Sequence, residues 1–268
     1  MRSSGEKPVE PQDIRPESGS ASPRASNEND GAWSSAARFF DAIAGRYDRA
    51  YALDVTESRR RMVPVLGVLP PPPARVIDLG VGTGRELPFL LDRGYTVTGI
   101  DISRAMLDRC RRRARPIDLV QADFWRPLPF LEAAFDAVIA LHGTLAHAPD
   151  DRSLGRLATE LARVTVPGAV WMSEVPSPAW LDDLDDSPRH EGYAFQRTGA
   201  RTCVYEDRVA SATIEVRIPS AEQWHAALDP LWDCDIEGVL EDAAPPNRTP
   251  LAAQTSGQKE WCIVARRR

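Results

Sequence analysis

The sequence lacks the features of a membrane-spanning, secreted or metal-binding chain. No apolar run approaches the roughly 18 residues that a spanning helix requires, and the N-terminus shows no apolar core of a secretory signal. The chain has only four cysteines and no CxxC pair, so neither a zinc knuckle nor a redox motif is indicated. Widely spaced cysteines are typical of reduced thiols in the cytosol. We therefore expect a cytoplasmic protein with no metal site.

An excess of positive charge is also missing. The chain carries 33 Lys and Arg against 39 Asp and Glu, which gives a formal net charge of −6. General nucleic-acid binding needs a basic surface, and the short arginine runs at 59–61 and 111–113 are expected to lie on solvated helix faces. We therefore expect no nucleic-acid partner and no membrane partner, and a chain that is a monomer or a homodimer.

Large apolar side chains are scarce in residues 1–32, which are rich in Ser, Pro, Glu, Gly and Asn. Such a segment buries too little apolar surface to offset the entropy lost on ordering, so it predicts a disordered tail. Order is expected from Trp33 onward. Aromatic and apolar side chains recur every three or four positions over 34–52 and predict a helix, and a second helix is expected over 57–67.

Short apolar strands alternate with amphipathic helices after the proline run at 70–73. Strands are expected over 75–79, 96–100, 117–120, 136–141 and 169–175. Helices are expected over 85–93, after an N-cap at Ser103, and after an N-cap at Asp150 or Asp151. This alternation predicts an α/β fold of the Rossmann-like kind, an open, twisted, mostly parallel sheet with helices on both faces.

The pattern changes beyond Pro176. An acidic loop is expected over 178–190, antiparallel strands over 193–218, a helix over 220–229, and two last strands over 234–240 and 260–266 with a loop at 241–257 between them. We interpret 33–268 as one domain whose last strand is antiparallel. Its N-terminal helices at 33–68 would form a lid, and 178–218 would be a small antiparallel insertion on the substrate side.

Three glycines at alternate positions, Gly80, Gly82 and Gly84, follow the first strand of the sheet and precede a helix. Glycine allows the tight turn and lets a ligand approach the backbone. The spacing GxGxG differs from the dinucleotide pattern GxGxxG, and no GK[ST] of a phosphate loop is present. Asp78 stands two residues before the first glycine, where a carboxylate would repel a pyrophosphate but suits an ammonium group.

Two more acids stand at the ends of the next strands. Asp101 closes the second strand, where a carboxylate can accept hydrogen bonds from both ribose hydroxyls. Asp123 follows the third strand and can accept from an adenine amino group, while Phe124 packs against the ring. Three acids at the tips of successive strands indicate a nucleoside site without phosphate. S-adenosylmethionine (SAM), an adenosine joined to methionine through a sulfonium, is such a ligand.

The order DLGVGTGR, GIDIS, ADF, FDAVIALH and PGAVWMSEVP resembles the class I SAM-dependent methyltransferases, especially the branch that acts on small molecules. The resemblance covers about residues 36–175 and extends weakly through 220–228. It implies that SAM is the cofactor, with the glycine loop on its methionine part, Asp101 on the ribose, and Asp123 with Phe124 on the adenine. It also makes Ile102, Met106 and Leu141 candidate cofactor contacts.

Residues 38–48 are similar to the lid helix of that family, which would bring Tyr47 near the methionine end; packing of Tyr47 in the core is an equal alternative. His142 and His147 follow the fourth strand in a segment that resembles loops of small-amine N-methyltransferases. Either is a candidate catalytic base, unless both only shape the loop. Four aromatic residues are candidates for the lining of the acceptor site, with packing in the core as the alternative for each: Phe39, Tyr51, Trp125 and Trp180.

These features predict an enzyme that transfers a methyl group from SAM to a small-molecule acceptor by in-line displacement, with nitrogen or oxygen expected ahead of carbon as the acceptor atom. The alternative is a non-catalytic SAM-binding sensor or subunit with the same fold. A nicotinamide oxidoreductase is a third candidate, against which the GxGxG spacing weighs.

Overall fold

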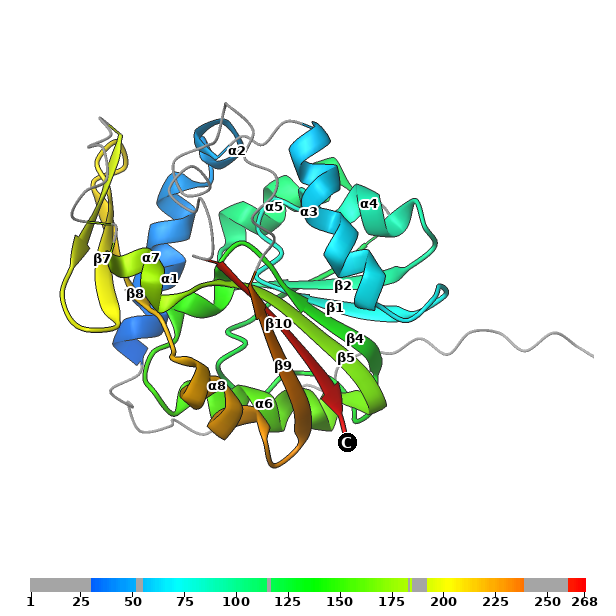
Figure 1. The fold of residues 1–268 in the computed structure, drawn as a ribbon. Helices are drawn as coiled ribbons and strands as arrows, with labels where there is room; N and C mark the ends of the chain where they lie inside the picture. The colour runs from blue at the N-terminus through cyan, green and yellow to red at the C-terminus, as the bar shows by residue number, and fades with distance from the viewer. Residues whose placement is uncertain (1–29, 52–54, 115–116, 183, 185–191, 239–259) are drawn as a thin grey trace, which may run out of the picture.

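The computed structural model describes residues 30–51, 55–114, 117–182, 184, 192–238 and 260–268 (Figure 1). A seven-stranded sheet in the order β3-β2-β1-β4-β5-β10-β9 forms the centre of the molecule. Its strands are β1 (Arg75–Leu79), β2 (Thr96–Asp101), β3 (Asp118–Gln121), β4 (Phe135–Ala140), β5 (Thr165–Pro176), β9 (Trp232–Gly238) and β10 (Glu260–Arg267). Strands β1 to β5 run parallel, and β10 is antiparallel to both β5 and β9. The predicted Rossmann-like α/β sheet is confirmed.

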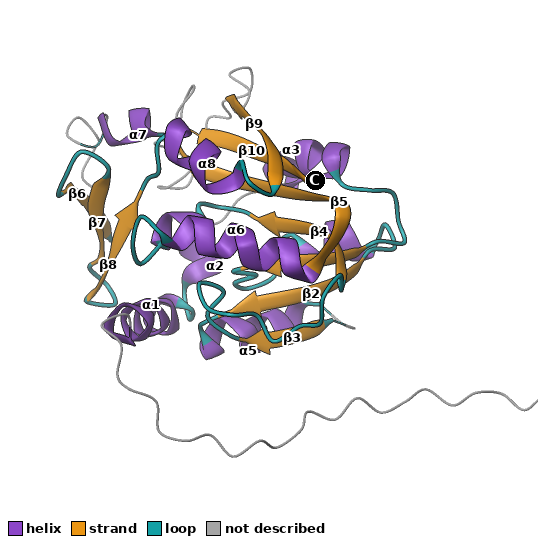
Figure 2. Ribbon diagram, turned by 90° about the horizontal axis from the view of Figure 1, so that it is seen from below, coloured by secondary structure: helices purple, strands orange, loops and turns teal. Residues whose placement is uncertain are grey.

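Helices cover both faces of this sheet (Figure 2). They are α1 (Asp30–Ile43), α2 (Tyr47–Ala50), α3 (Val55–Val68), α4 (Leu87–Leu91), α5 (Arg104–Arg113), η1 (Thr144–His147, a 3-10 turn), α6 (Ser153–Val164), α7 (Pro178–Asp182) and α8 (Ala221–Leu228). Neighbouring residues of β1 point to opposite faces, as the pleat requires. Val76 packs in the cluster with residues of α3, α4 and α5, whereas Ile77 packs with residues of α6 and α8.

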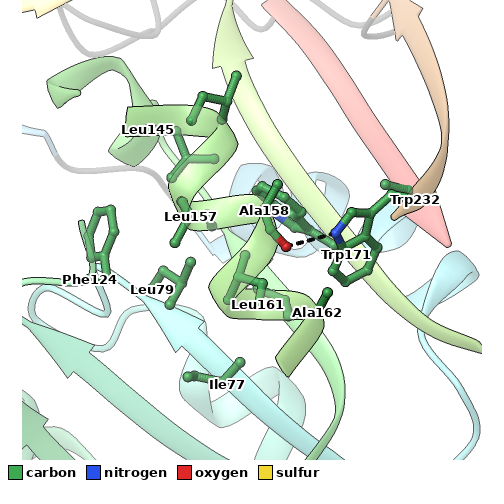
Figure 3. Close-up of a cluster of buried hydrophobic side chains, with 14 of the residues drawn as sticks. Ile77, Leu79, Phe124, Leu145, Leu157, Ala158, Leu161, Ala162, Trp171 and Trp232 are labelled. Atoms are coloured by element: carbon green, nitrogen blue, oxygen red, sulfur yellow. Dashed lines mark hydrogen bonds between the residues drawn. The ribbon is translucent and has the colours of Figure 1, made fainter. Parts of the chain in front are cut away.

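Tryptophans fill the core between β5, α6, α8 and β9 (Figure 3). The ring of Trp171 lies 6.2 Å from that of Trp224 and 5.6 Å from that of Trp232, both edge to face. The Trp232 Nε1–H donates to the Ala158 carbonyl at 3.0 Å, which satisfies a polar group of a fully buried side chain. This contact fixes the C-terminal strands against α6.

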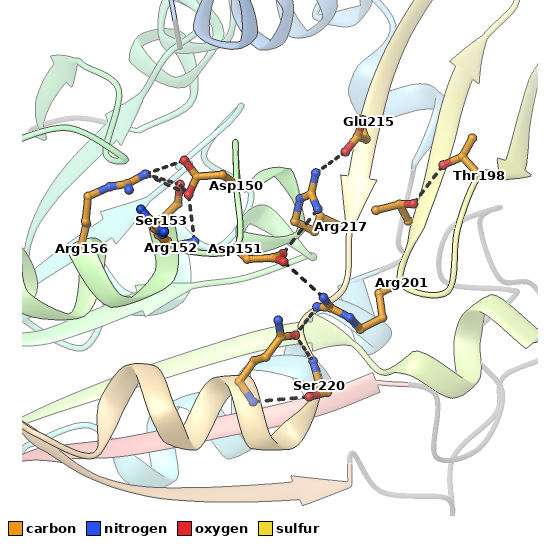
Figure 4. A network of polar contacts seen from close by, with 12 residues as sticks. Asp150, Asp151, Arg152, Ser153, Arg156, Thr198, Arg201, Glu215, Arg217 and Ser220 are labelled. Carbon is orange, nitrogen blue, oxygen red and sulfur yellow. Dashed lines mark hydrogen bonds and ion pairs between the residues drawn. The ribbon is translucent and has the colours of Figure 1, made fainter. Parts of the chain in front are cut away.

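A separate antiparallel sheet, the small sheet, consists of β6 (Tyr193–Arg197), β7 (Thr202–Asp207) and β8 (Ala212–Arg217), and confirms the expected strands over 193–218. A polar network connects it to the main domain (Figure 4). Asp151 accepts from Arg201 and from Arg217 at 3.4 Å each, and Arg201 also donates to Gln223 in the capping box of α8. The network holds the small sheet beside η1, at the end of the main sheet where its parallel strands terminate.

Three local expectations were wrong, and one element was not predicted. The single helix over 34–52 is broken at 44–46 into α1 and α2, where Gly45 weakens helical propensity. Residues 178–182 form α7 instead of a loop. The turn η1 was not anticipated. The N-cap of α6 is Arg152, while Asp150 accepts from the Arg152 N–H just ahead of the helix.

Residues 1–29 of the expected tail and the whole of the expected loop at 241–257 lie outside the described residues, and α1 begins at Asp30, inside the tail boundary. Within the part that the structure describes, no helix is both long and apolar enough to cross a bilayer.

Candidate functional site

A cavity opens at the carboxyl ends of the parallel strands, between the sheet and the small sheet. The strand order reverses between β1 and β4 at this point, which is where open α/β sheets bind ligands. Side chains from α1, α2, η1, α7 and the small sheet close the other side of the cavity. Of the residues proposed for the cofactor, those that line it are Tyr47, Gly80, Gly82, Asp101, Ile102, Met106, Asp123 and Phe124, while Asp78, Gly84 and Leu141 lie behind the wall.

The glycine loop has three left-handed residues, with φ of +67° at Gly80, +54° at Gly82 and +73° at Gly84. A Cβ on Gly80 would stand 2.5 Å from Thr144 Cγ2, and one on Gly84 would stand 2.7 Å from Cys110 Sγ. A Cβ on Gly82 would meet only the Gly80 carbonyl oxygen, at 3.8 Å. Gly80 and Gly84 are therefore required for packing, whereas Gly82 leaves open space on the cavity side.

Asp101 joins the end of β2 to this loop. Its Oδ2 accepts from the Gly82 N–H at 2.8 Å, and its Oδ1 accepts from the Ser103 N–H at 2.8 Å. Burial raises the pKa of Asp101 to about 6, although the two backbone donors act in the opposite direction. Each carboxylate oxygen keeps a lone pair, so the carboxylate can still accept from a diol in the cavity.

Asp123 and Phe124 follow β3. Asp123 accepts from the Trp125 N–H at 3.0 Å and pairs with Arg126 at 3.3 Å, and burial raises its pKa. The rings of Phe124 and Trp125 lie 5.0 Å apart and both line the cavity. The pair offers a hydrogen-bond acceptor next to flat apolar surface, as the adenine site requires.

Asp78 lies on β1 beneath the loop and is almost completely buried. Burial raises its pKa well above the ordinary value, and the negative charges of Glu86 and Asp101 raise it further. A carboxylate in such surroundings favours a nearby cation. Asp78 does not line the cavity itself but lies two residues before Gly80, which does.

Side-chain hydrogen bonds connect the N-terminal helices to the loop and to α5. Thr83 Oγ1 donates to Asp48 Oδ1 at 2.5 Å, and Arg113 Nη2 reaches Asp48 Oδ2 at 2.5 Å. Asp41 of α1 accepts from Ser103 Oγ at 2.6 Å. These contacts place α1 and α2 over the cavity, in the position that a lid would occupy.

Tyr47 lies at the cavity under the guanidinium of Arg85, whose Cζ is 5.4 Å from the ring centroid. Arg85 also donates to the Tyr51 carbonyl at 2.6 Å, and the rings of Tyr47 and Tyr51 lie 4.8 Å apart. Burial raises the pKa of Tyr47, so it remains a neutral phenol. Tyr47 therefore lines the cavity and also packs against the cluster that contains Phe39 and Ile43 of α1.

His142 is enclosed by charged groups that the sequence did not reveal. Its ring Nε2 lies 2.5 Å from Glu86 Oε1, and its backbone N–H donates to Glu174 Oε2 at 3.2 Å. Arg61 pairs with the same Glu174 carboxylate at 2.5 Å. Burial alone would raise the pKa of Glu86, but His142 and Arg85 lower it to about 2. With its Nε2 engaged by Glu86, His142 lies in a buried network of charged side chains at the cavity.

His147 has a different environment. Its Nδ1 lies 3.4 Å from the Glu215 carbonyl oxygen of β8, and its ring meets that of Phe40 edge to face at 5.3 Å. Burial lowers the pKa of His147 to about 4, so the ring is neutral at pH 7. With Nδ1–H donating to the carbonyl, Nε2 keeps its lone pair.

Of the aromatic residues expected at the acceptor site, Tyr51, Trp125 and Trp180 line the cavity, whereas Phe39 is buried in the core. Sequence reasoning missed Arg61, Glu86 and Glu174, which come from three separate elements. Arg85 was missed as well, although its place directly after the glycine loop was a usable signal. Among the described residues, no group of three or more His, Cys, Asp and Glu side chains is arranged to hold a metal ion.

Comparisons with known proteins agree with this geometry. A family model described as a methyltransferase domain matches residues 76–168. A demethylmenaquinone methyltransferase from Beutenbergia cavernae is 34% identical over 149 residues, which cover 54% of this chain and 59% of that protein. A trans-aconitate 2-methyltransferase from an Acidovorax species is 30% identical over 166 residues, which cover 60% and 58%. The chain thus spans less than two thirds of the length of either relative.

The fold is also that of a solved structure, a DhpI–SAM–HEP complex, with a TM-score of 0.59 at 18% identity over 91% of this chain and 100% of the other. The residues around the cavity fit SAM: Gly82 leaves the space that a Cβ would fill, and the buried Asp78 and Asp101 have raised pKa values that a cationic partner would relieve. The chain is therefore similar to methyltransferases in sequence over residues 76–168, and its fold is that of SAM-dependent methyltransferases.

Proposed function

We propose that this protein transfers the methyl group of SAM to a small-molecule acceptor, at nitrogen or oxygen ahead of carbon. The observation that carries the proposal is the arrangement of the glycine loop, Asp101 and Asp123 around one side of a cavity whose other side is lined by aromatic side chains. The loop and Asp78 would hold the methionine part, Asp101 the ribose, and Asp123 with Phe124 the adenine.

When bound, SAM supplies a methyl group on a positively charged sulfur, which is already a strong electrophile. The chain's own residues then have two tasks, to orient the acceptor and to exclude water. Asp101 fixes the loop through the Gly82 N–H, and the lid helices cover the cavity through the contacts of Asp48 and Asp41.

Two measurements test the proposal. Calorimetry should detect SAM binding, and labelled SAM should pass its methyl group to members of a small-molecule panel. Absence of SAM binding would overturn the proposal, and binding without turnover on any acceptor would favour the sensor alternative. Thermal stabilisation by NAD but not by SAM would favour an oxidoreductase.

SAM affinity is expected to fall as the pH drops below about 6. Asp101, with a pKa of about 6, is ionised above this pH and accepts from the ribose hydroxyls, whereas the protonated carboxyl loses acceptor strength. The dissociation constant should then rise by up to about tenfold per pH unit, the limit for one linked proton. Calorimetry between pH 5 and 8 on the native protein and on Asp101→Asn checks this, since the variant should show a flat profile over the same range.

His142→Ala is expected to destabilise the fold by about 1–3 kcal/mol, because it leaves the buried Glu86 without its closest partner. Urea denaturation measures the loss. His225→Ala, at an exposed position of α8, is the matched control and should unfold like the native protein. A His142→Ala variant with native stability but turnover reduced a thousandfold would instead identify His142 as the base.

A further inference from the structure

The side of the cavity opposite the glycine loop is built from rings. We call it the aromatic wall, formed by Phe40 of α1, His147 of η1, Trp180 of α7, and Phe195, Tyr205 and Val216 of the small sheet. Phe195 and Tyr205 stack with their centroids 4.7 Å apart and their planes 16° from parallel, and Trp180 meets Phe195 edge to face at 5.1 Å. A wall of flat apolar surfaces favours a flat apolar ligand.

Ionised side chains that line the cavity lie elsewhere. They are Arg61, Arg85, Asp101, Asp123, Glu174 and Glu260, which come from α3, the main sheet and the loops at the ends of its strands. The aromatic wall as described contributes no carboxylate and no guanidinium. An anionic acceptor buried there would lose its hydration without a partner. A cationic acceptor could gain from the ring faces, but it would lie close to the positive sulfur with no carboxylate on the wall to offset the repulsion.

His147 is a hydrogen-bonding group on the wall with a ring nitrogen available to a ligand. His147 donates from Nδ1 to the Glu215 carbonyl, which β8 holds in place, and so presents the lone pair of Nε2. An acceptor lone pair on a neutral imidazole binds an O–H donor. The wall thus pairs apolar ring surfaces with an acceptor of a hydroxyl proton at His147. The Tyr205 hydroxyl and the Trp180 Nε1–H of the same wall are buried and have no hydrogen-bond partner among the described residues.

We propose, on the basis of the proposed function, that the methyl acceptor is a neutral aromatic compound with a ring hydroxyl, bound on the aromatic wall with its O–H donating to His147 Nε2. The hydroxyl oxygen uses a lone pair to form the O–CH3 bond as the S–CH3 bond breaks and its electron pair goes to sulfur. The hydroxyl proton passes to His147 Nε2 as the oxygen becomes positive, and then to solvent. The products are an aryl methyl ether and S-adenosylhomocysteine.

Calorimetry on the full chain saturated with S-adenosylhomocysteine tests the class of acceptor. The probes are 2-naphthol, 2-naphthoate, 2-naphthylmethylammonium and 2-methoxynaphthalene, which share one ring system. We expect 2-naphthol to bind at least about tenfold more tightly than each of the other three, the effect of one unmatched polar group. Tighter binding of the ammonium or the carboxylate probe, or equal binding of all four, would overturn the proposal.

Two variants locate the site. Phe195→Ser should weaken 2-naphthol binding by about tenfold or more through lost ring contact. His147→Phe keeps the wall apolar and removes Nε2. This variant should therefore bind 2-naphthol and 2-methoxynaphthalene with about equal affinity. A preference unchanged in His147→Phe would overturn the role of His147. Both variants should retain native affinity for S-adenosylhomocysteine, so loss of nucleoside binding by the native protein would count against the proposed function and not against this acceptor.

Discussion

Asp101→Asn is expected to weaken SAM binding by about 30-fold to 1000-fold, which corresponds to roughly 2–4 kcal/mol for charge-assisted hydrogen bonds lost from a buried carboxylate. The carboxylate accepts from the Gly82 and Ser103 N–H groups and is placed to accept from the ribose diol as well. An amide of the same shape offers one oxygen for these donors and turns its NH2 group toward the others.

The same substitution should change the stability of the ligand-free protein little. Because the folded pKa of Asp101 lies at about 6, above its ordinary 3.8, the folded state prefers the uncharged form. The group's contribution to stability therefore rises as the pH falls from about 6 toward 3.8, and a neutral amide avoids the cost of the buried charge.

Calorimetry with SAM and thermal unfolding without it separate the two effects. Asp118→Asn, the same change at an exposed position of β3, is the matched control and should leave both measurements unchanged. If Asp101→Asn bound SAM within threefold of the native protein, the ribose would not lie at Asp101.

Gly84→Ala and Gly82→Ala are expected to separate folding from binding. Both residues have positive φ, so alanine costs about 1–2 kcal/mol of backbone strain at either position. At Gly84 the new Cβ also stands 2.7 Å from both Cys110 Sγ and Leu87 Cδ1 in a closed core, which raises the expected loss to about 2–5 kcal/mol. At Gly82 the Cβ points into open space.

We therefore expect Gly82→Ala to remain folded and to lose SAM affinity by at least about tenfold, since its methyl group occupies the space where the cofactor backbone must approach. Urea denaturation and SAM calorimetry on the two variants measure the difference. Equal losses of stability with SAM affinity retained in Gly82→Ala would mean that the ligand does not touch this loop.

Local patterns in the sequence predicted most of the main sheet. The strand over 75–79 was predicted from a run of buried residues, and it corresponds to β1. The N-cap at Ser103 was predicted from its residue type, and its side chain accepts from the Met106 N–H. The alternation over 193–218 corresponds to the strands of the small sheet, because a pleated strand has one polar face. The same holds for the glycine loop and for Asp101, whose positions follow from where parallel strands end.

Other features depended on residues far apart in the chain. The contacts of His142 with Glu86 and Glu174 join residues from different elements, and no spacing in the sequence predicts them. The two histidines also differ in their surroundings: His142 lies in an ion network, whereas His147 keeps a free ring nitrogen. The surroundings of His147 follow from the position of β8 beside η1. The break at Gly45 depends on the docking of α1 and α2 onto α5.

By itself the sequence determined the order of the elements, the position of the glycine loop and the carboxylates that we propose for a nucleoside, because strand periodicity and glycine conformation are local properties. Only the tertiary structure decided which histidine keeps a free ring nitrogen, which residues form the aromatic wall and which charged side chains compensate one another. Those choices depend on burial and on through-space distances, which are set when the helices, the sheet and the small sheet pack together.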